Sequence, residues 1–515
     1  MHRQQALARI RDGAETWDVL VVGGGATGVG AAVDAASRGY RTLLLEARDF
    51  GKGASSRSTK LIHGGVRYLR QGNLSLVRSA LEERAVLLRL APHLVREITF
   101  VVPSYGIREG LVHSIGLALY DALAGRRALG RSRSVPAREV LGLVPTIDAR
   151  GLRGGTLFRD ARFEDARLLV HLARTAAREG AVLVNHAPVV ALERRGDVLH
   201  AALEDRETGE RLTTSARAVI NAAGPFVDDV RRLDDPAAPR LTRASRGTHV
   251  VLPRTFLPGE TALLLPDAGE GRVVFLVPWR DRVLLGTTDV AVDAPSEDPS
   301  PSAAEVEGLL ALAGDVLAKR PAAEDVRSVF AGLRPLPARP GRTSAIARDH
   351  VVRVASSGLV TVAGGKWTTY RRMAKDAVDR AAEVGGLPPR ACRTDTLLLH
   401  GAEGGASPSW HGSDAAAFAA LCRERPELAA PVHPGLAVLG GDVVWAARFE
   451  MARTVEDVLA RRTQALLLDA KAAAEASPEV AKLLARELGR DAAWERRETE
   501  SFERLSAAFR PEGLR

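Results

Sequence analysis

The chain has 515 residues, of which 46% are hydrophobic and 26% charged, and its formal net charge is +9. This length predicts two or three domains, and the composition is typical of a soluble globular protein. The positive charge suits anionic substrates or anionic lipid better than nucleic acid, because no dense Lys/Arg run with interleaved aromatic residues is present.

The cysteines and the apolar runs limit the kinds of site and anchor that we expect. Cys392 and Cys422 lie 30 residues apart without metal-ligand spacing around them, so we expect no iron–sulfur cluster, zinc site, disulfide framework or other metal site. A reducing compartment is the simpler interpretation. The N-terminus lacks the apolar core of a secretory signal. The nearest candidate for a bilayer span, residues 111–124, is too short and contains His113 and Asp121.

Residues 1–16 predict a basic helical extension, and a glycine-rich turn follows it. From Asp18 to Glu46 the order is strand, glycine turn, helix, strand, acid, with Gly23, Gly25 and Gly28 in the G-x-G-x-x-G pattern. In such a turn the glycines permit a tight bend, close approach to a pyrophosphate and close packing of helix on strand. The helix N-terminus would face the phosphates, and Glu46 would accept a hydrogen bond from a ribose hydroxyl. The pattern predicts a dinucleotide site but does not separate NAD from FAD.

Residues 49–69 form a segment dense in serine, glycine and basic residues. Its hydroxyls, its cationic heads and a glycine pair that lets backbone pass close to a flat ligand favour a ligand-binding loop over a solvated one. The candidate residues are Ser55, Ser56, Ser58, Thr59, Lys60, His63, Gly64, Gly65, Arg67 and Tyr68.

Hydrophobic periodicity predicts the elements of the middle of the chain. Expected in order are a helix from residue 74, a strand at 98–103, a helix carrying Leu111, Ile115, Leu119 and Leu123, and an arginine-rich connector at 125–134. A helix at 166–178, a strand at 181–185, a hairpin at 189–204 and a strand entering a small-residue turn at 218–227 then return to the cofactor domain. Gly224 in that turn would let backbone approach a ligand.

Beyond residue 240 the hydrophobic pattern changes. Four short apolar runs between residues 240 and 330 predict an antiparallel sheet, and Ser302 with Glu305 predicts a capping box at the start of a helix. Farther on, Gly364 and Gly365 end a strand, Lys366 lies in the turn, and Thr368 or Thr369 is expected to cap a helix whose dipole could stabilise negative charge. The tail from residue 385 is expected to be helical, with N-cap signals at Thr454 and Ser477.

Taken in order, these stretches resemble the FAD-dependent glycerol-3-phosphate dehydrogenases, the aerobic respiratory enzymes among the glycine-oxidase-like flavoproteins. The resemblance rests on VVGGGATGVGAAVDAASRGY, SSRSTKLIHGGVRYL, NAAGPFVD, RGTHVVLP, VPWRDRVLLGTTD, AGLRPL, GGKWTTYRRMA and EMARTVEDVLARRT. It implies an α/β fold with a Rossmann-like FAD-binding domain, an inserted antiparallel β-sheet/α substrate domain and a C-terminal all-α domain. The expected ranges are 1–90, 145–240 and 326–384 for the FAD-binding domain, 91–144 and 241–325 for the substrate-binding domain, and 385–515 for the helical domain.

The resemblance also implies a role for each candidate residue. FAD would be bound by Gly23, Gly25, Gly28, Glu46, Ser55, Ser56, Thr59, Gly224, Gly364, Gly365 and Thr368, with Ser55, Ser56 and Thr59 at the flavin end. Arg67, Tyr68 and Arg348 would bind substrate. His249, Arg334 and Lys366 would be catalytic: His249 is the candidate base, Lys366 is the competing base or alkoxide stabiliser, and Arg334 would polarise the substrate oxygen.

The implied reaction is oxidation of sn-glycerol 3-phosphate to dihydroxyacetone phosphate by hydride transfer to FAD, with electrons passed to a quinone. The implied location is the inner face of the cytoplasmic membrane, where a peripheral protein would meet an anionic surface; the helical tail would serve in a homodimer contact or in docking. Two alternatives stay open. One is an oxidase that acts on glycerol 3-phosphate or an amino acid with oxygen, and the other is a non-catalytic FAD-binding scaffold that senses redox state at the membrane.

Overall fold

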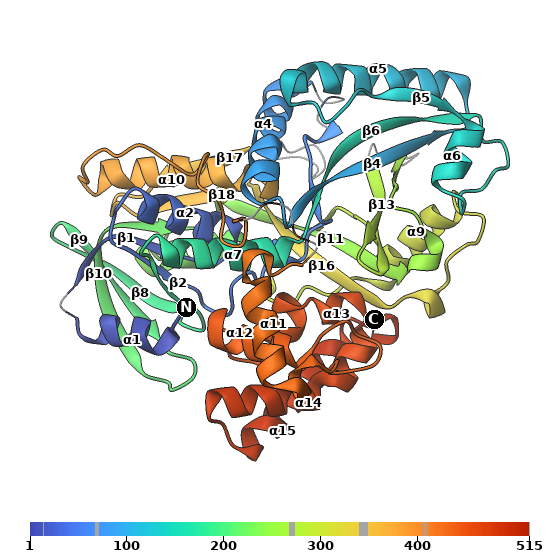
Figure 1. Cartoon of the computed structure of the whole chain (residues 1–515). Coiled ribbons are helices and arrows are strands. Elements are labelled where there is room, and N and C mark those ends of the chain that lie inside the picture. Colours follow the sequence, from blue (N-terminus) through green and yellow to red (C-terminus); the bar gives the residue numbers. More distant parts are fainter. Residues whose placement is uncertain are drawn as a thin grey trace.

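The computed structural model describes residues 1–13, 15–66, 69, 72–266, 273–338, 349–403, 405, 407 and 409–513. Figure 1 shows one sheet with its helices on the left, a second sheet on the right, and the C-terminal helices, in orange and red, below both. The two sheets adjoin where strand β16 (Ser328–Pro337) of the second contacts strand β18 (Val360–Gly364) of the first.

The first sheet contains the predicted dinucleotide-binding unit. Strands β18, β10, β1, β2 and β7 lie parallel in that order, β17 pairs antiparallel with β18, and a β8–β9 hairpin extends β10. The strand bounds are β1 Thr16–Val22, β2 Thr42–Leu45, β7 Val182–Val184, β8 Val189–Arg195, β9 Val198–Glu204, β10 Arg211–Asn221 and β17 His350–Val354.

Helices cover both faces of this sheet, which explains why β1 and β2 are almost continuously apolar. One face packs against α2 (Ala26–Ser37), α7 (Asp165–Arg178) and α10 (Tyr370–Val384). The other face packs against α1 (Arg3–Arg11) and the β8–β9 hairpin. Helix α8 (Val227–Asp234) follows the turn after β10. The predicted N-terminal helix and βαβ unit are therefore confirmed.

The second sheet is mainly antiparallel and has the order β15-β11-β14-β13-β12-β4-β6-β3, with β16 on β11 and β5 on β6. The remaining strand bounds are β3 Leu61–Ile62, β4 Val95–Ser104, β5 Arg133–Pro136, β6 Gly154–Phe163, β11 Thr242–Pro253, β12 Ala262–Pro266, β13 Val273–Trp279, β14 Arg282–Gly286 and β15 Val290–Val292. Its helices are α4 Leu74–Leu90, α5 Ile107–Ala124, α6 Ala137–Leu143 and α9 Ala303–Gly314.

Three strands from ranges that the sequence assigns to the cofactor domain belong to this second sheet, namely β3, β6 and β16. Strand β16 pairs along its whole length with β11, and β6 pairs with β4. Their apolar side chains help to form the cores on the two faces of the second sheet, so pairing with distant strands, which periodicity does not reveal, decides their membership.

The C-terminal helices share a hydrophobic core with one face of the second sheet. They are α11 Ala415–Glu424, α12 Gly440–Phe449, a π-helix Asp457–Arg462, α13 Ala465–Leu468, α14 Ala470–Leu488 and α15 Ala492–Ala507. Among the helices that the structure describes, each is too short or too polar to cross a bilayer.

The predicted helix caps can be compared with the structure. The capping box of Ser302 and Glu305 is present at α9, and the Thr454 hydroxyl accepts a hydrogen bond of 3.1 Å from the Asp457 N–H. The predicted N-cap at Ser477 is wrong: the N-cap of α14 is Asp469, eight residues earlier, and the helix continues through Pro478. Proline removes the N–H that would bind the Ala474 carbonyl, and the Ser477 hydroxyl donates to that carbonyl instead, at 2.8 Å.

The expected cap at Thr368 or Thr369 also differs in the structure. A short 3₁₀ turn, Trp367–Thr369, precedes α10, and neither threonine side chain caps the helix. The Thr368 hydroxyl instead accepts from the His63 N–H at 3.3 Å and donates to the His63 carbonyl at 3.4 Å. Thr368 therefore joins the 3₁₀ turn to the predicted ligand-binding loop. Thr369 does occupy the N-cap position of α10, as expected, but its hydroxyl donates to the Lys366 carbonyl at 3.2 Å instead of accepting from the helix.

Candidate active site

One cavity of about 540 Å³ lies where the two sheets meet. Its walls begin at Glu46, at the end of β2, pass the glycine turn and Lys366, and reach Phe275 on β13. Because residues of both sheets line the same space, a long ligand held at the glycine turn can extend to the polar residues of the second sheet.

The glycine turn has the geometry of a dinucleotide cradle. Gly23 has a φ of +114°, and a Cβ there would lie 2.7 Å from the Ala222 carbonyl oxygen of the neighbouring strand. A Cβ at Gly28 would lie 1.9 Å from the Gly23 carbonyl oxygen, so α2 packs directly on the turn. The turn thus exposes backbone N–H groups at the start of α2, where they can bind phosphate.

Glu46 closes the other end of this cradle. Its carboxylate lines the cavity and accepts hydrogen bonds from the backbone N–H groups of Gly24 and, at 2.8 Å, Arg48. Burial raises the pKa of Glu46, although these two hydrogen bonds lower it. The carboxylate is therefore held in one orientation beside the glycine turn, in the position that the sequence predicts for a ribose contact.

The predicted loop places its hydroxyl groups in different surroundings. The Ser55 hydroxyl lines the cavity and accepts from the Ala26 N–H at 3.0 Å, so it lies at the start of α2. The Ser56 hydroxyl does not line the cavity; it is buried and donates to the Gly51 carbonyl at 2.8 Å. Ser55 thus lies beside the phosphate end of the cradle, and Ser56 holds the loop itself.

Three glycines on the second sheet make room for the polar groups of the cavity. A Cβ at Gly247 would lie 2.3 Å from Nη2 of Arg334, and one at Gly286 would lie 2.4 Å from Cδ2 of His249. A Cβ at Gly332 would lie 2.8 Å from the Arg57 carbonyl oxygen. The absence of these side chains lets Arg334, His249 and the 54–60 loop approach the sheet closely.

His249 lies on β11 and lines the cavity beside Gly286. Its ring stacks on Phe330 with centroids 4.9 Å apart, and its Nε2 is 2.9 Å from the Thr59 hydroxyl oxygen. Burial lowers the pKa of His249 well below its ordinary value, and the positive charges of Arg334 and Lys60 lower it further. The imidazole is therefore neutral at physiological pH, which is the state that a general base needs.

Arg334 and Lys366 provide positive charge in the same cavity. Arg334 donates to the Thr288 carbonyl at 3.1 Å and to the Thr287 hydroxyl at 3.0 Å, so its guanidinium is fixed over Gly247. Lys366 follows Gly364 and Gly365, whose φ values of +82° and +72° shape the turn that presents it. A preorganised cation of this kind can stabilise an anionic oxygen.

The remaining predicted residues divide into two groups. Thr59, Gly25, Gly224, Gly364, Gly365 and Thr368 all line the cavity. The substrate-binding candidates Arg67, Tyr68 and Arg348 lie outside the described residues.

Sequence reasoning missed the groups that hold the glycine pair of the ligand-binding loop. The Gly64 N–H donates to the Tyr120 hydroxyl at 2.7 Å, Tyr120 donates to Asp160 at 2.7 Å, and Arg84 pairs with Asp160 at 2.9 Å. It also missed the two threonines of the GTTD stretch that fix Arg334. These residues come from four separate segments. A tyrosine or arginine within an otherwise apolar pattern could have indicated Tyr120 and Arg84, and the threonines lie in a stretch that carries the resemblance.

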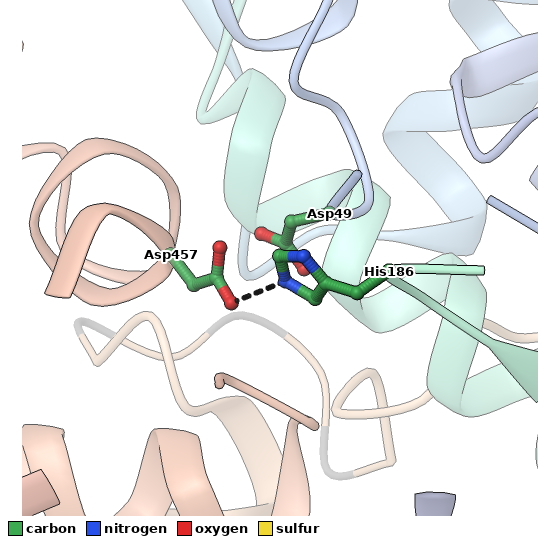
Figure 2. A group of neighbouring side chains, drawn as sticks. All are labelled: Asp49, His186 and Asp457. Atoms are coloured by element: carbon green, nitrogen blue, oxygen red, sulfur yellow. Dashed lines mark hydrogen bonds and ion pairs between the residues drawn. The ribbon is translucent and has the colours of Figure 1, made fainter. Parts of the chain in front are cut away.

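Figure 2 shows Asp49, His186 and Asp457, whose ligand atoms lie close enough together to suggest a cation site. The carboxylates are already neutralised by protein cations, because Arg461 contacts both of them and Arg462 donates to both oxygens of Asp49 at 2.6 and 2.8 Å. Burial alone would lower the pKa of His186, but Asp457 raises it above its ordinary value. The group is a buried ion-pair network that joins the C-terminal domain to Asp49, at the start of the predicted ligand-binding loop, hereafter the cofactor loop.

Comparison with known proteins gives matches over nearly the whole chain. A family model described as FAD dependent oxidoreductase matches residues 18–371, and one described as the C-terminal domain of alpha-glycerophosphate oxidase matches residues 392–495. The probable mitochondrial glycerol-3-phosphate dehydrogenase of Caenorhabditis elegans is 38% identical, covering 97% of this chain and 74% of its own. The human mitochondrial enzyme is 36% identical, covering 95% and 73%.

A solved structure agrees with these sequence matches. The glycerol-3-phosphate dehydrogenase of Bacillus halodurans, complexed with FAD, superposes with a TM-score of 0.77 at 26% identity and covers 98% of this chain and 97% of its own. The glycine oxidase of Geobacillus kaustophilus shares the fold at 20% identity with a TM-score of 0.56. The cofactor of this chain is FAD, as predicted, and the cradle of Gly23, Gly28 and Glu46 fits its dinucleotide part.

Proposed function

Because the chain belongs to the FAD-dependent glycerol-3-phosphate dehydrogenase family, we propose that it oxidises sn-glycerol 3-phosphate to dihydroxyacetone phosphate and passes the electrons to a quinone. The observation that carries this proposal is the single cavity that joins the FAD cradle to His249, Arg334 and Lys366. A phosphorylated alcohol needs fixed cations for its anionic group and a base for its hydroxyl, and these residue types supply both.

Bound FAD supplies a hydride acceptor for C2 of the substrate. Arg334, held by Thr287 and Thr288, stabilises the oxygen at C2 as it loses its proton, and Lys366 provides a second positive charge beside it. His249, neutral because of its burial, receives that proton. Arg67, Tyr68 and Arg348 are assigned to the phosphate by resemblance.

The test is anaerobic mixing of the FAD-loaded protein with sn-glycerol 3-phosphate. We expect the flavin absorbance band to bleach, and we expect glycerol or glycine at equal concentration to leave it unchanged. R334Q should slow bleaching by about 10- to 100-fold, because it removes a charged hydrogen bond to the reacting oxygen. An unchanged spectrum of the unmodified protein with glycerol 3-phosphate would refute the proposal and favour the non-catalytic scaffold.

The acceptor is tested in the oxidative half of the cycle. The reduced protein is mixed either with a short-chain quinone or with oxygen, and reoxidation and peroxide are followed. We expect rapid reoxidation by the quinone with little peroxide. Fast, stoichiometric peroxide formation would make the protein an oxidase instead.

A surface on α5 supports placement of the protein at a membrane. Leu111, Val112, Ile115 and Leu119 expose 62%, 68%, 63% and 45% of their surface, at positions that form a stripe on the helix. The segment that follows α5 carries exposed arginines at 126, 131 and 133. In Figure 1, α5 lies along the edge of the molecule opposite the C-terminal helices. Apolar residues beside arginines suit the interface of an anionic leaflet.

Flotation with anionic lipid vesicles tests this placement. We expect the protein to float with the vesicles, and L111E/I115E to remain in solution, because two carboxylates would enter the lipid interface. V190E provides a matched control, because Val190 is also exposed, at 38%, but lies on the β8–β9 hairpin. Equal flotation of L111E/I115E and the parent would rule out α5 as the contact surface.

A further inference from the structure

The neighbours of His249 restrict how its ring can act. Phe330 stacks on one side of the ring, and the backbone at Gly286 lies so close to Cδ2 that a methyl group would not fit. The side chain is buried, with 2% of the residue exposed. Nε2, the atom that would accept a proton from the cavity, is directed at the Thr59 hydroxyl at 2.9 Å.

In the contact between Thr59 and His249, Thr59 is the residue nearer to the solvent-accessible cavity. It lines the cavity and is only half-buried, so its hydroxyl can meet a ligand and His249 at the same time. A threonine hydroxyl has one proton to donate and two lone pairs to accept with. Donation to Nε2 leaves both lone pairs of the Thr59 oxygen available to a hydroxyl group in the cavity.

Lys60, the next residue, fixes Thr59 in this position. Lys60 has a φ of +60°, a conformation that is uncommon for residues other than glycine. Its ammonium group is buried, binds both oxygens of Asp165 at 2.7 Å, and donates to the Ser56 carbonyl at 2.8 Å. The Ser58 hydroxyl also donates to Asp165 at 2.7 Å. The residues on both sides of Thr59 are therefore anchored to one buried carboxylate.

We propose that Thr59 is a proton relay between the substrate hydroxyl and His249. In the proposed oxidation the C2–H bond breaks and its electron pair leaves as hydride to the flavin. The O–H bond at C2 breaks as the Thr59 oxygen takes that proton, and the former Thr59 proton forms the new N–H bond at Nε2. Threonine is regenerated, the carbonyl forms at C2, and the imidazole carries the charge. This inference rests on the proposed function.

The first test compares threonine with an isosteric residue that lacks the hydroxyl. In T59V we expect the limiting rate of flavin reduction by glycerol 3-phosphate to fall by about 100-fold or more, because a proton-transfer group is lost. The substrate concentration that gives half of the limiting rate should change little. T59S keeps a hydroxyl and should restore most of the rate. Flavin absorbance confirms that each variant retains FAD. Reduction of T59V at the parent rate would overturn the relay.

The second test asks whether Thr59 and His249 act in one pathway. If they do, T59V/H249Q should be no slower than the slower of the two single variants, because groups that act as a unit are not additive. A double variant slowed by the product of the single effects would overturn the relay. If the unmodified protein itself fails to reduce its flavin, the proposed function fails and not the relay alone.

The third test needs no turnover. With ¹⁵N-labelled histidine, the Nε2 resonance of His249 is assigned by its loss in H249Q, in the oxidised protein without substrate. We expect this resonance to shift in T59V and to return close to its original position in T59S. The same position in parent and T59V would show that the hydroxyl does not bind Nε2, and would overturn the proposal.

Discussion

At the scale of single residues, Gly247 gives a sharp test of how Arg334 is positioned. A Cβ at this position would lie 2.3 Å from Nη2 and 2.6 Å from Cζ of Arg334. The guanidinium can move, so G247A should fold and retain FAD but lose the alignment of Arg334 with the substrate. We expect kcat/KM for glycerol 3-phosphate to fall by about 10- to 100-fold, measured by steady-state quinone reduction.

Gly308 provides the matched control for this substitution. It lies on α9, and a Cβ there would have no neighbour within 4 Å. We expect G308A to leave kcat/KM unchanged and to stabilise the helix by about 0.5–1 kcal/mol. If both variants retain the parent activity, Arg334 does not depend on the hollow at Gly247.

The sequence could identify Arg334 as a candidate because it lies in AGLRPL, one of the stretches that carry the family resemblance. It could not show that Arg334 lies over Gly247. That relation follows from the register of β16 on β11, in which Arg334 pairs with Ser245 and Gly332 with Gly247. A strand register depends on packing across the whole sheet, so the motif marks Arg334 as a candidate but does not show what holds it.

At the scale of elements, the π-helix Asp457–Arg462 is the connection between the C-terminal domain and the cofactor loop. Burial alone would raise the pKa of Asp49, but Arg462 and Arg461 hold it below its ordinary value. D49N would remove the carboxylate that neutralises these two buried arginines, and we expect the free energy of unfolding to fall by about 3–5 kcal/mol. We expect faster release of FAD, followed by fluorescence, and faster proteolysis of the C-terminal helices.

An exposed ion pair provides the comparison for D49N. Glu210 accepts two hydrogen bonds from Arg11, at 2.9 and 2.6 Å, but the pair lies at the surface, with side chains that are 35% and 48% exposed. E210Q should therefore leave both the stability of the chain and the rate of FAD release close to those of the parent, because solvent screens this pair. FAD release from D49N at the parent rate would show that the network does not hold the cofactor loop.

The elements themselves were predictable where one pattern dominated. The glycine turn, the hairpin and the capped helix α9 each have a local signal, and each is present. Helix α14 was mispredicted because Ser477–Pro478 reads as a helix start, whereas burial of Ala472, Ala473 and Ala476 continues the helix through the proline. Tertiary packing there outweighs the local preference.

At the scale of the whole molecule, a buried histidine pair joins three distant segments. His93 precedes β4, His171 lies on α7, and their nitrogens are 3.0 Å apart, while His171 also contacts the His400 carbonyl at 2.7 Å. Such a pair gives no sequence signal, because the two histidines are 78 residues apart.

This pair makes the stability of the folded chain depend on pH. Burial lowers the pKa of His93 to about 4, with a further contribution from Arg167, and burial lowers that of His171 well below its ordinary value. Between pH 6.5 and 4 the unfolded chain therefore binds protons that the folded chain does not, so the free energy of unfolding falls as the pH falls. In H93Q, which keeps an acceptor for His171 but does not titrate, this loss should be smaller by on the order of 2 kcal/mol.

Urea midpoints at pH 7.0, 5.5 and 4.5 measure the difference, with H200Q on β9 as the control expected to follow the parent. If H93Q loses stability as steeply as the parent when the pH falls, the histidine pair is not the cause of this pH dependence.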